Sequence, residues 1–118
     1  MPGLLLDTDV LVDSFRGARR LEVGRERVWY SVVTRCELVA GRSVNEELVR
    51  ATLGLFDEIA VDRAIAERAG RLRRASDVRT ADALIAAAAL IHGLDLVTRN
   101  RRDFDRIDGL VVRDPSTL

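Results

Sequence analysis

Four acidic residues, far apart in this sequence, could together hold a metal ion. They are Asp7, Glu37, Asp82 and Asp103. Clustered carboxylates repel one another and stay ionised together only when cations lie between them. Hard oxygen ligands without histidine or cysteine favour Mg²⁺ or Mn²⁺. Such ions lower the pKa of a bound water and stabilise charge on a phosphoryl oxygen, so the chemistry indicated is phosphodiester hydrolysis.

Each acid also has an ordinary structural explanation. Asp7 could cap the helix that follows it, and Glu37 could be a solvated helix residue. Asp82 could complement a helix dipole, and Asp103 could form a capping box with Asn100. These explanations stay open for each residue taken alone. The metal site is favoured only if the fold brings the four acids together.

Hydrophobic patterning divides the chain into alternating strands and helices. Strands are expected at Leu4–Leu6, Val28–Tyr30, Glu58–Val61, Leu94–Thr98 and Leu110–Val112. Helices are expected at Thr8–Phe15, Val32–Val39, Asn45–Phe56, Asp62–Ala75 and Thr80–His92, with a short one from Asn100. The alternation predicts a three-layer α/β/α arrangement with a central parallel sheet of four to five strands. No repeat or linker interrupts residues 1–118, so we expect a single domain.

A parallel sheet would bring the four acids to one edge. The carboxyl ends of its strands form a single rim, where ligands bind in open α/β folds. Asp7 directly follows the first strand, and Glu37 lies on the helix after the second. Asp82 lies in the first turn of the alanine-rich helix, and Asp103 lies in the short helix after the strand that ends at Thr98. We therefore expect all four to face the same rim.

The composition excludes several other mechanisms. All 19 basic residues are arginines, so no mechanism can use a catalytic lysine. The single cysteine, Cys36, excludes an internal disulfide and fits a reducing compartment. The single histidine, His92, disfavours a histidine-based zinc site or a Ser-His-Asp triad. The longest apolar run, Ala83–Ile91, is too short to span a bilayer, and no signal peptide is recognisable. We expect a cytoplasmic protein without membrane contact.

The chain resembles the PIN-domain ribonucleases, in particular the VapC-like toxins of bacterial toxin–antitoxin pairs. The matching segments, in the family's order, are LLLDTDVLVDSFRG, YSVVTRCELVAGR, RTADALIAAAALIHGLDLVTRNRRDF and LVVR. The resemblance implies that Mg²⁺ or Mn²⁺ binds to Asp7, Glu37, Asp82 and Asp103. It implies supporting roles for Thr8, Ser31, Thr98 and Asn100, and more loosely for Thr80.

The resemblance also implies an activity and partners. The activity is that of an endoribonuclease toxin, in which a metal-activated water attacks an RNA phosphodiester. The partners are a cognate antitoxin, which inserts a segment into a groove of the toxin, and a second copy in a homodimer. An apolar seam for a partner could be formed by Val44, Leu48, Leu55 and Phe56, although core packing explains them equally well. We expect RNA phosphates to be contacted by Arg99, Arg101 and Arg102, which flank the proposed site.

Three further acids lie near these motifs. Asp9 could support the site or simply begin the first helix, and Asp77 stands close to Asp82 as a lesser candidate ligand. Asp13 is expected on the first helix, paired with Arg16.

Two alternative functions remain. A haloacid-dehalogenase-like phosphatase would use Asp7 as a nucleophile and Asp9 as acid and base, but that family normally needs a lysine. A non-catalytic PIN-like module that binds RNA or protein is the second alternative. The presence of all four acids disfavours it.

Overall fold

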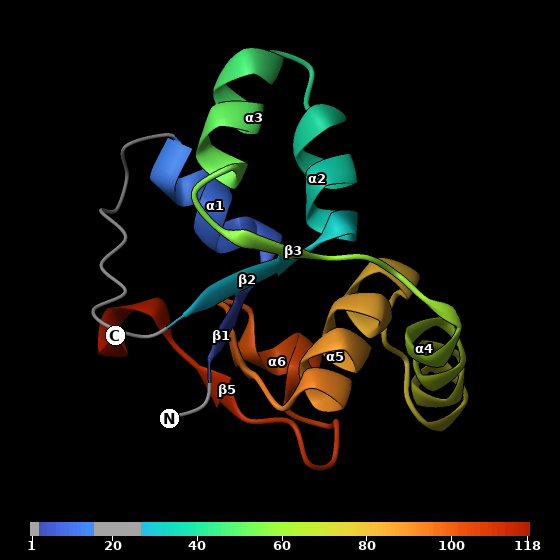
Figure 1. Cartoon of the computed structure of the whole chain (residues 1–118). Coiled ribbons are helices and arrows are strands. Elements are labelled where there is room, and N and C mark those ends of the chain that lie inside the picture. Colours follow the sequence, from blue (N-terminus) through green and yellow to red (C-terminus); the bar gives the residue numbers. More distant parts are fainter. Residues whose placement is uncertain (1–2, 16–26) are drawn as a thin grey trace.

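The computed structural model describes residues 3–15 and 27–118 of the chain. Its strands are β1 (Leu4–Leu6), β2 (Val28–Ser31), β3 (Asp57–Ile59), β4 (Asp95–Val97) and β5 (Val112–Arg113). Its helices are α1 (Thr8–Phe15), α2 (Val32–Val39), α3 (Glu46–Leu53), α4 (Arg63–Ala75), α5 (Thr80–His92) and α6 (Arg101–Phe104), followed by a 3₁₀ turn at Pro115–Thr117. Successive strands are separated by one or two helices, in the order that the hydrophobic pattern predicts (Figure 1).

The strands form one parallel sheet in the order β3-β2-β1-β4-β5. This confirms the α/β class and the central parallel sheet. The chain builds outward from β1 through β2 to β3, then returns to place β4 on the other side of β1. The strand order therefore reverses between β1 and β4. In open α/β sheets this switch point is where ligands bind.

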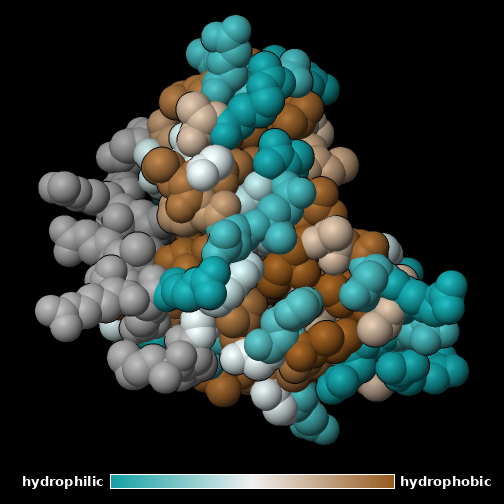
Figure 2. All heavy atoms as spheres, in the orientation of Figure 1, coloured by the Kyte–Doolittle hydropathy of each residue, from teal (hydrophilic) through white to brown (hydrophobic). Residues whose placement is uncertain are grey.

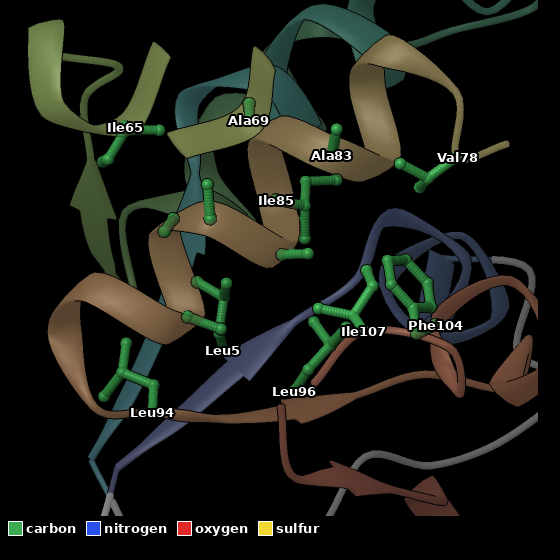
Figure 3. Packing of buried hydrophobic residues seen from close by; sticks show 14 of the residues in the cluster. Leu5, Ile65, Ala69, Val78, Ala83, Ile85, Leu94, Leu96, Phe104 and Ile107 are labelled. Carbon is green, nitrogen blue, oxygen red and sulfur yellow. The ribbon is translucent and has the colours of Figure 1, made fainter. Parts of the chain in front are cut away.

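Helices cover both faces of the sheet (Figure 1). Alternate residues of β1 belong to the two clusters on these faces. Leu4 and Leu6 pack with the helices α1, α2 and α3. Leu5 points to the opposite face and packs, together with Leu96 of β4, in the cluster formed with α4, α5 and α6 (Figure 3). The three-layer arrangement follows from this alternation, because the central strand β1 is buried on both faces.

Helix α5 is buried along most of its length. Ala83, Ile85 and the alanines at 86–89 are almost completely inaccessible, packed between the sheet and α4. The small alanine side chains take up little room between α5 and the sheet. Helix α4 covers it from outside, and the outer surface of α4 is largely hydrophilic (Figure 2).

Several element boundaries differ from the predicted ones by a few residues. The third helix ends at Leu53, not Phe56, because Gly54 provides its C-cap. Strand β3 ends at Ile59, before the predicted Val61, and the chain turns toward Asp62, whose side chain caps α4. The segment from Ala18 to Arg27, expected to be a charged surface, lies almost wholly outside the described residues. Among the described residues, no helix is long and apolar enough to cross a membrane.

Two glycines provide a matched test of the helical layer. Gly93 ends α5 with a φ of 65°, whereas Gly70 lies inside α4, and a Cβ at either position would meet nothing within 4 Å. We expect Gly93→Ala to destabilise the protein by about 1 kcal/mol, because the left-handed conformation strains an L-residue. Gly70→Ala should stabilise it by about 0.5–1 kcal/mol. Urea denaturation measures both, and shifts of the same sign would contradict these assignments.

Candidate active site

Asp7 lies at the switch point, at the end of β1. Its backbone N–H donates to the carbonyl of Val97 on β4 at 2.9 Å, and its side chain is 5% exposed. The Oδ1 atom accepts a hydrogen bond from the Thr8 N–H at 2.8 Å, and Oδ2 accepts one from the Thr98 hydroxyl, also at 2.8 Å. Asp7 does therefore accept the first amide of α1. Its second oxygen is held instead by a hydroxyl from the end of β4.

The environment of Asp7 disfavours its charge. Burial, and after it the negative charge of Asp9, raise the pKa of Asp7 from 3.8 to about 7. The hydrogen bonds from Thr98 and Thr8 act in the opposite direction, and Asp82 adds a smaller upward contribution. A carboxyl group in this position is favourable at neutral pH only if something neutralises it.

Thr8 connects Asp7 to Glu37. Its backbone N–H is bound to Asp7, and its hydroxyl donates to Glu37 Oε1 at 2.6 Å. The hydroxyl oxygen of Thr34, which is completely buried, lies 3.0 Å from that of Thr8. Glu37 is therefore held toward α1 and not free on the surface of α2. Because Glu37 accepts this hydrogen bond, it is not simply a solvated residue on the surface of a helix.

Asp82 is half-buried in the first turn of α5. Burial is the main cause that raises its pKa, and the charges of Asp103, Glu37 and Asp9 raise it further. Arg79, whose Nε lies 3.7 Å from Asp82 Oδ2, lowers it. The mutual effect of these carboxylates means that they lie within electrostatic range of one another. The structure thus places the four predicted acids around one region.

Asp103 is exposed on α6 and faces a cleft of about 540 Å³ beside Asp82. The cleft is lined by Ser76, Asp77, Val78, Arg79, Asp82, Asn100, Arg102, Asp103 and Arg106. The Asn100 N–H donates to the Thr98 hydroxyl oxygen at 3.0 Å, and the Asn100 side chain makes no capping hydrogen bond. The capping-box explanation of Asp103 is therefore not observed.

Asp9 lies on α1 next to Asp7 and is tied to the end of β4. Its Oδ2 atom accepts a hydrogen bond from the Arg99 N–H at 3.1 Å and lies 3.4 Å from the Thr98 hydroxyl oxygen. Its Oδ1 atom is buried without a hydrogen-bond partner among the described residues. Burial raises the pKa of Asp9. The Arg99 Nε lies 2.8 Å from Asp13 Oδ2, whereas the partner predicted for Asp13, Arg16, lies outside the described residues.

The remaining supporting residues have distinct positions. Ser31 is buried and caps α2, because its Oγ accepts the Val33 N–H at 3.1 Å, and it thereby fixes the helix that carries Glu37. Thr98 is fully buried and contacts both Asp7 and Asp9. Thr80 is exposed at the first position of α5.

A second groove, of about 390 Å³, lies on the α1–α2–α3 side of the acids. Glu37 lines it together with apolar side chains such as Val12, Phe15 and Leu48. Of the four residues predicted as a partner seam, Val44 and Leu48 line this groove, Phe56 packs against the core, and Leu55 is largely exposed. The acids are therefore reached from two sides, one apolar and one charged.

Two features of the acidic residues bear on whether they could bind a cation. Within residues 3–15 and 27–118, no three His, Cys, Asp or Glu side chains converge closely enough to form a ready-made metal site. The buried Oδ1 of Asp9 without a partner and the raised pKa values of Asp7 and Asp82 indicate negative charge that is not neutralised locally. A hard divalent cation matches this set of oxygen donors.

Sequence reasoning missed three contributors to this region. Thr34 lies behind Thr8, and Arg79 and Arg106 line the charged cleft. The signal for both arginines was their spacing, because Arg79 precedes Asp82 by three positions and Arg106 follows Asp103 by three. Neither lies within a helix, since Arg79 is the N-cap of α5 and Arg106 follows α6, so only their nearness in sequence to a proposed ligand indicates them. No comparable signal distinguishes Thr34 in the sequence.

Comparisons with known proteins identify the family and the fold. The family model that matches is the PIN domain, over residues 4–110. The chain is 30% identical over 120 residues to "Ribonuclease VapC1" of Methanocaldococcus jannaschii, which covers 94% of this chain and 87% of the relative. A toxin–antitoxin complex from Klebsiella pneumoniae has a TM-score of 0.84 and 36% identity, covering 96% of this chain and 98% of the other. A DNA-bound VapBC structure from Salmonella typhimurium has a TM-score of 0.83 and 26% identity, covering 98% and 99%.

Because the pKa of Asp7 is raised, the free energy of unfolding of the metal-free protein, measured in EDTA, should depend on pH. The pKa of Asp7 is about 7 in the folded state, against the ordinary value of 3.8, which represents the unfolded state. The contribution of Asp7 protonation to the free energy of unfolding is therefore complete below pH 3.8 and is lost as the pH rises through 7. The free energy of unfolding should therefore fall toward pH 8, by up to roughly 4 kcal/mol from this group. Asp7→Asn should remove most of the fall and be more stable than the unsubstituted protein at pH 8.

Urea denaturation across this pH range, in EDTA, measures the effect. Asp108→Asn, which changes an exposed acid, is the control and should keep the original pH dependence. Identical pH profiles for Asp7→Asn and the unsubstituted protein would show that Asp7 is not the group responsible.

Proposed function

Because this chain belongs to the PIN domain family, we propose that it is a VapC-type ribonuclease, the toxin of a toxin–antitoxin pair. The single observation that carries the catalytic proposal is the placement of Asp7 at the switch point of the sheet. There it lies within electrostatic range of Asp9 and Asp82, and Thr8 links it to Glu37. The reaction proposed is metal-dependent hydrolysis of an RNA phosphodiester.

The proposed metal ligands are Asp7, Glu37, Asp82 and Asp103. The cation is Mg²⁺ or Mn²⁺, since the donors are carboxylate oxygens without a nearby histidine or thiolate in the set. When bound, such a cation supplies an activated water and stabilises the charge that develops on the phosphoryl oxygen. The buried charge of Asp7, unfavourable by itself, supports the proposal because a cation would neutralise it.

The hydroxyl groups around the acids have a positioning role. Thr98 donates to Asp7 Oδ2, and Thr8 donates to Glu37 Oε1, so each fixes the rotamer of one proposed ligand. Ser31 fixes the first turn of the helix that carries Glu37. Asn100 is held by its backbone on Thr98 and presents its side chain to the charged cleft beside Asp103. Loss of such a supporting contact typically lowers metal affinity or activity about 10–100-fold.

An antitoxin is proposed as the protein partner. The similar structures from Klebsiella pneumoniae and Salmonella typhimurium are a toxin–antitoxin complex and a VapBC complex. In this chain the apolar groove that reaches Glu37 offers a surface on which such a partner could bind and cover the acids. A homodimer is proposed from the family resemblance alone. The non-catalytic module is the remaining alternative, and metal-dependent cleavage separates it from the enzyme.

RNA cleavage tests the proposed function. We expect purified protein to cut a labelled single-stranded RNA in Mn²⁺ or Mg²⁺ but not in EDTA. Asp7→Asn and Asp82→Asn should each lower the rate at least about 100-fold, because each removes a proposed ligand. Glu67→Gln, at an exposed position of α4, is the matched control and should be fully active. Cutting that survives both substitutions and EDTA would contradict the proposed site.

Calorimetric titration with Mn²⁺ tests the role of Thr98. Thr98→Val keeps the shape of the side chain but removes the donor to Asp7 Oδ2. We expect it to weaken Mn²⁺ binding about 10–100-fold, whereas Thr98→Ser, which keeps the hydroxyl, should bind nearly normally. Equal Mn²⁺ affinity in the two variants would show that the hydroxyl does not position Asp7.

A further inference from the structure

The cleft beside Asp82 and Asp103 has a distribution of charge that suits an anionic polymer. Three arginines and three aspartates line it: Arg79, Arg102, Arg106, Asp77, Asp82 and Asp103. Its formal charge is therefore zero as it stands. A single divalent cation on the acids would make it positive and leave the arginines free to attract phosphate.

We propose that this cleft is the RNA-binding channel of the site, and that Arg79, Arg102 and Arg106 contact phosphates on either side of the acids. The proposal rests on the proposed ribonuclease function and deepens it by assigning the substrate path. It also differs from the expectation from the sequence in the arginines that contact RNA phosphates.

Arg102 and Arg106 are available for such contacts. Both are exposed, both line the cleft, and neither makes an ion pair with another described residue. They lie four positions apart, on α6 and in the turn after it, with Asp103 between them in sequence. Because both side chains line the same cleft, their guanidinium groups can contact phosphates of one strand there.

Arg99 and Arg101, the other arginines predicted to contact RNA, are placed differently. The Arg99 side chain is engaged with Asp13 at 2.8 Å and lies 3.9 Å from Asp9 Oδ2. Arg101 is exposed but does not line the cleft. The geometry therefore favours Arg102 among the three, and adds Arg79 and Arg106.

Arg79 lines the cleft from the loop before α5, whereas Arg102 and Arg106 come from α6 and the turn after it. Its side chain is 81% exposed, and its Nε lies 3.7 Å from Asp82 Oδ2. A cation bound to Asp82 would compete with Arg79 for that carboxylate and release the guanidinium toward RNA. Removal of the Arg79 side chain should thus raise the affinity for the metal ion and lower the affinity for RNA. A merely structural role would not move the two affinities in opposite directions.

Fluorescence anisotropy with a labelled single-stranded RNA oligonucleotide tests the channel. Binding is measured in EDTA and in Ca²⁺ over a series of salt concentrations. We expect Arg102→Ala and Arg106→Ala each to weaken binding about three- to tenfold. Each should also reduce the slope of log affinity against log salt by about 0.7, the value for one lost single-strand phosphate contact. Arg102→Lys should retain the salt slope, because it keeps the positive charge that neutralises a phosphate.

Arg63→Ala is the matched control. Arg63 is an exposed arginine at the start of α4, about 20 Å along that helix from the cleft at Ser76. It should leave both affinity and salt slope unchanged. Thermal unfolding of every variant shows whether the fold is preserved.

Arg79→Ala provides the independent readout. It should weaken RNA binding by a similar factor while strengthening Mn²⁺ binding about two- to fivefold in calorimetry, as expected for the loss of an exposed ion pair. Weaker Mn²⁺ binding would overturn the role given to Arg79.

The outcomes separate the channel from the enzyme. Unchanged affinity and salt slope in both Arg102→Ala and Arg106→Ala, or an equal loss in Arg63→Ala, would overturn the channel even if the protein cleaves RNA. Failure of the unsubstituted protein to bind RNA in either buffer would overturn it as well. Displacement of the RNA by an acidic peptide at equal concentration would assign the cleft to a protein ligand instead. The arginine variants could lose affinity and salt slope as expected while the unsubstituted protein shows no metal-dependent cleavage. That result would support the RNA-binding channel and contradict the proposed ribonuclease activity.

Discussion

The buried carboxylate of Asp7 is the constraint on which the site depends. It lies where the strand order reverses, between β1 and β4, and is held by the Thr8 N–H on one oxygen and the Thr98 hydroxyl on the other. These bonds orient the group without neutralising it, and its pKa remains near 7. Burial of an acid at this point is a cost to folding that a bound cation would remove.

The two layers of helices give the acids two different approaches. The α1–α2–α3 layer leaves an apolar groove that ends at Glu37, and the loop before α5 together with α6 forms a cleft rich in arginine and aspartate. A protein partner and an RNA strand therefore need not compete for the same walls. In the proposed arrangement they meet only at the carboxylates, where occupation of one side can block the chemistry on the other.

Much of this arrangement could be predicted from the sequence, because it depends on backbone periodicity. Alternating strands and helices fix the parallel sheet, and a residue directly after a strand, such as Asp7, must lie at its carboxyl edge. Side-chain pairing was harder to predict. The link from Thr8 to Glu37 and the engagement of Arg99 by Asp13 depend on how α1 packs against its neighbours, which no local pattern records. The buried Thr34 reads in the sequence as an ordinary helical residue.

The central claim is that a divalent cation binds at the switch point with Asp7 as a ligand. A crystal of the protein grown with Mn²⁺, with diffraction data collected at the manganese absorption edge, tests it most directly. We expect an anomalous peak between Asp7 and Asp82, with carboxylate oxygens at about 2.0–2.2 Å from the ion, near the distances of small hard cations. An anomalous peak elsewhere, or none with Mn²⁺ in excess, would contradict it.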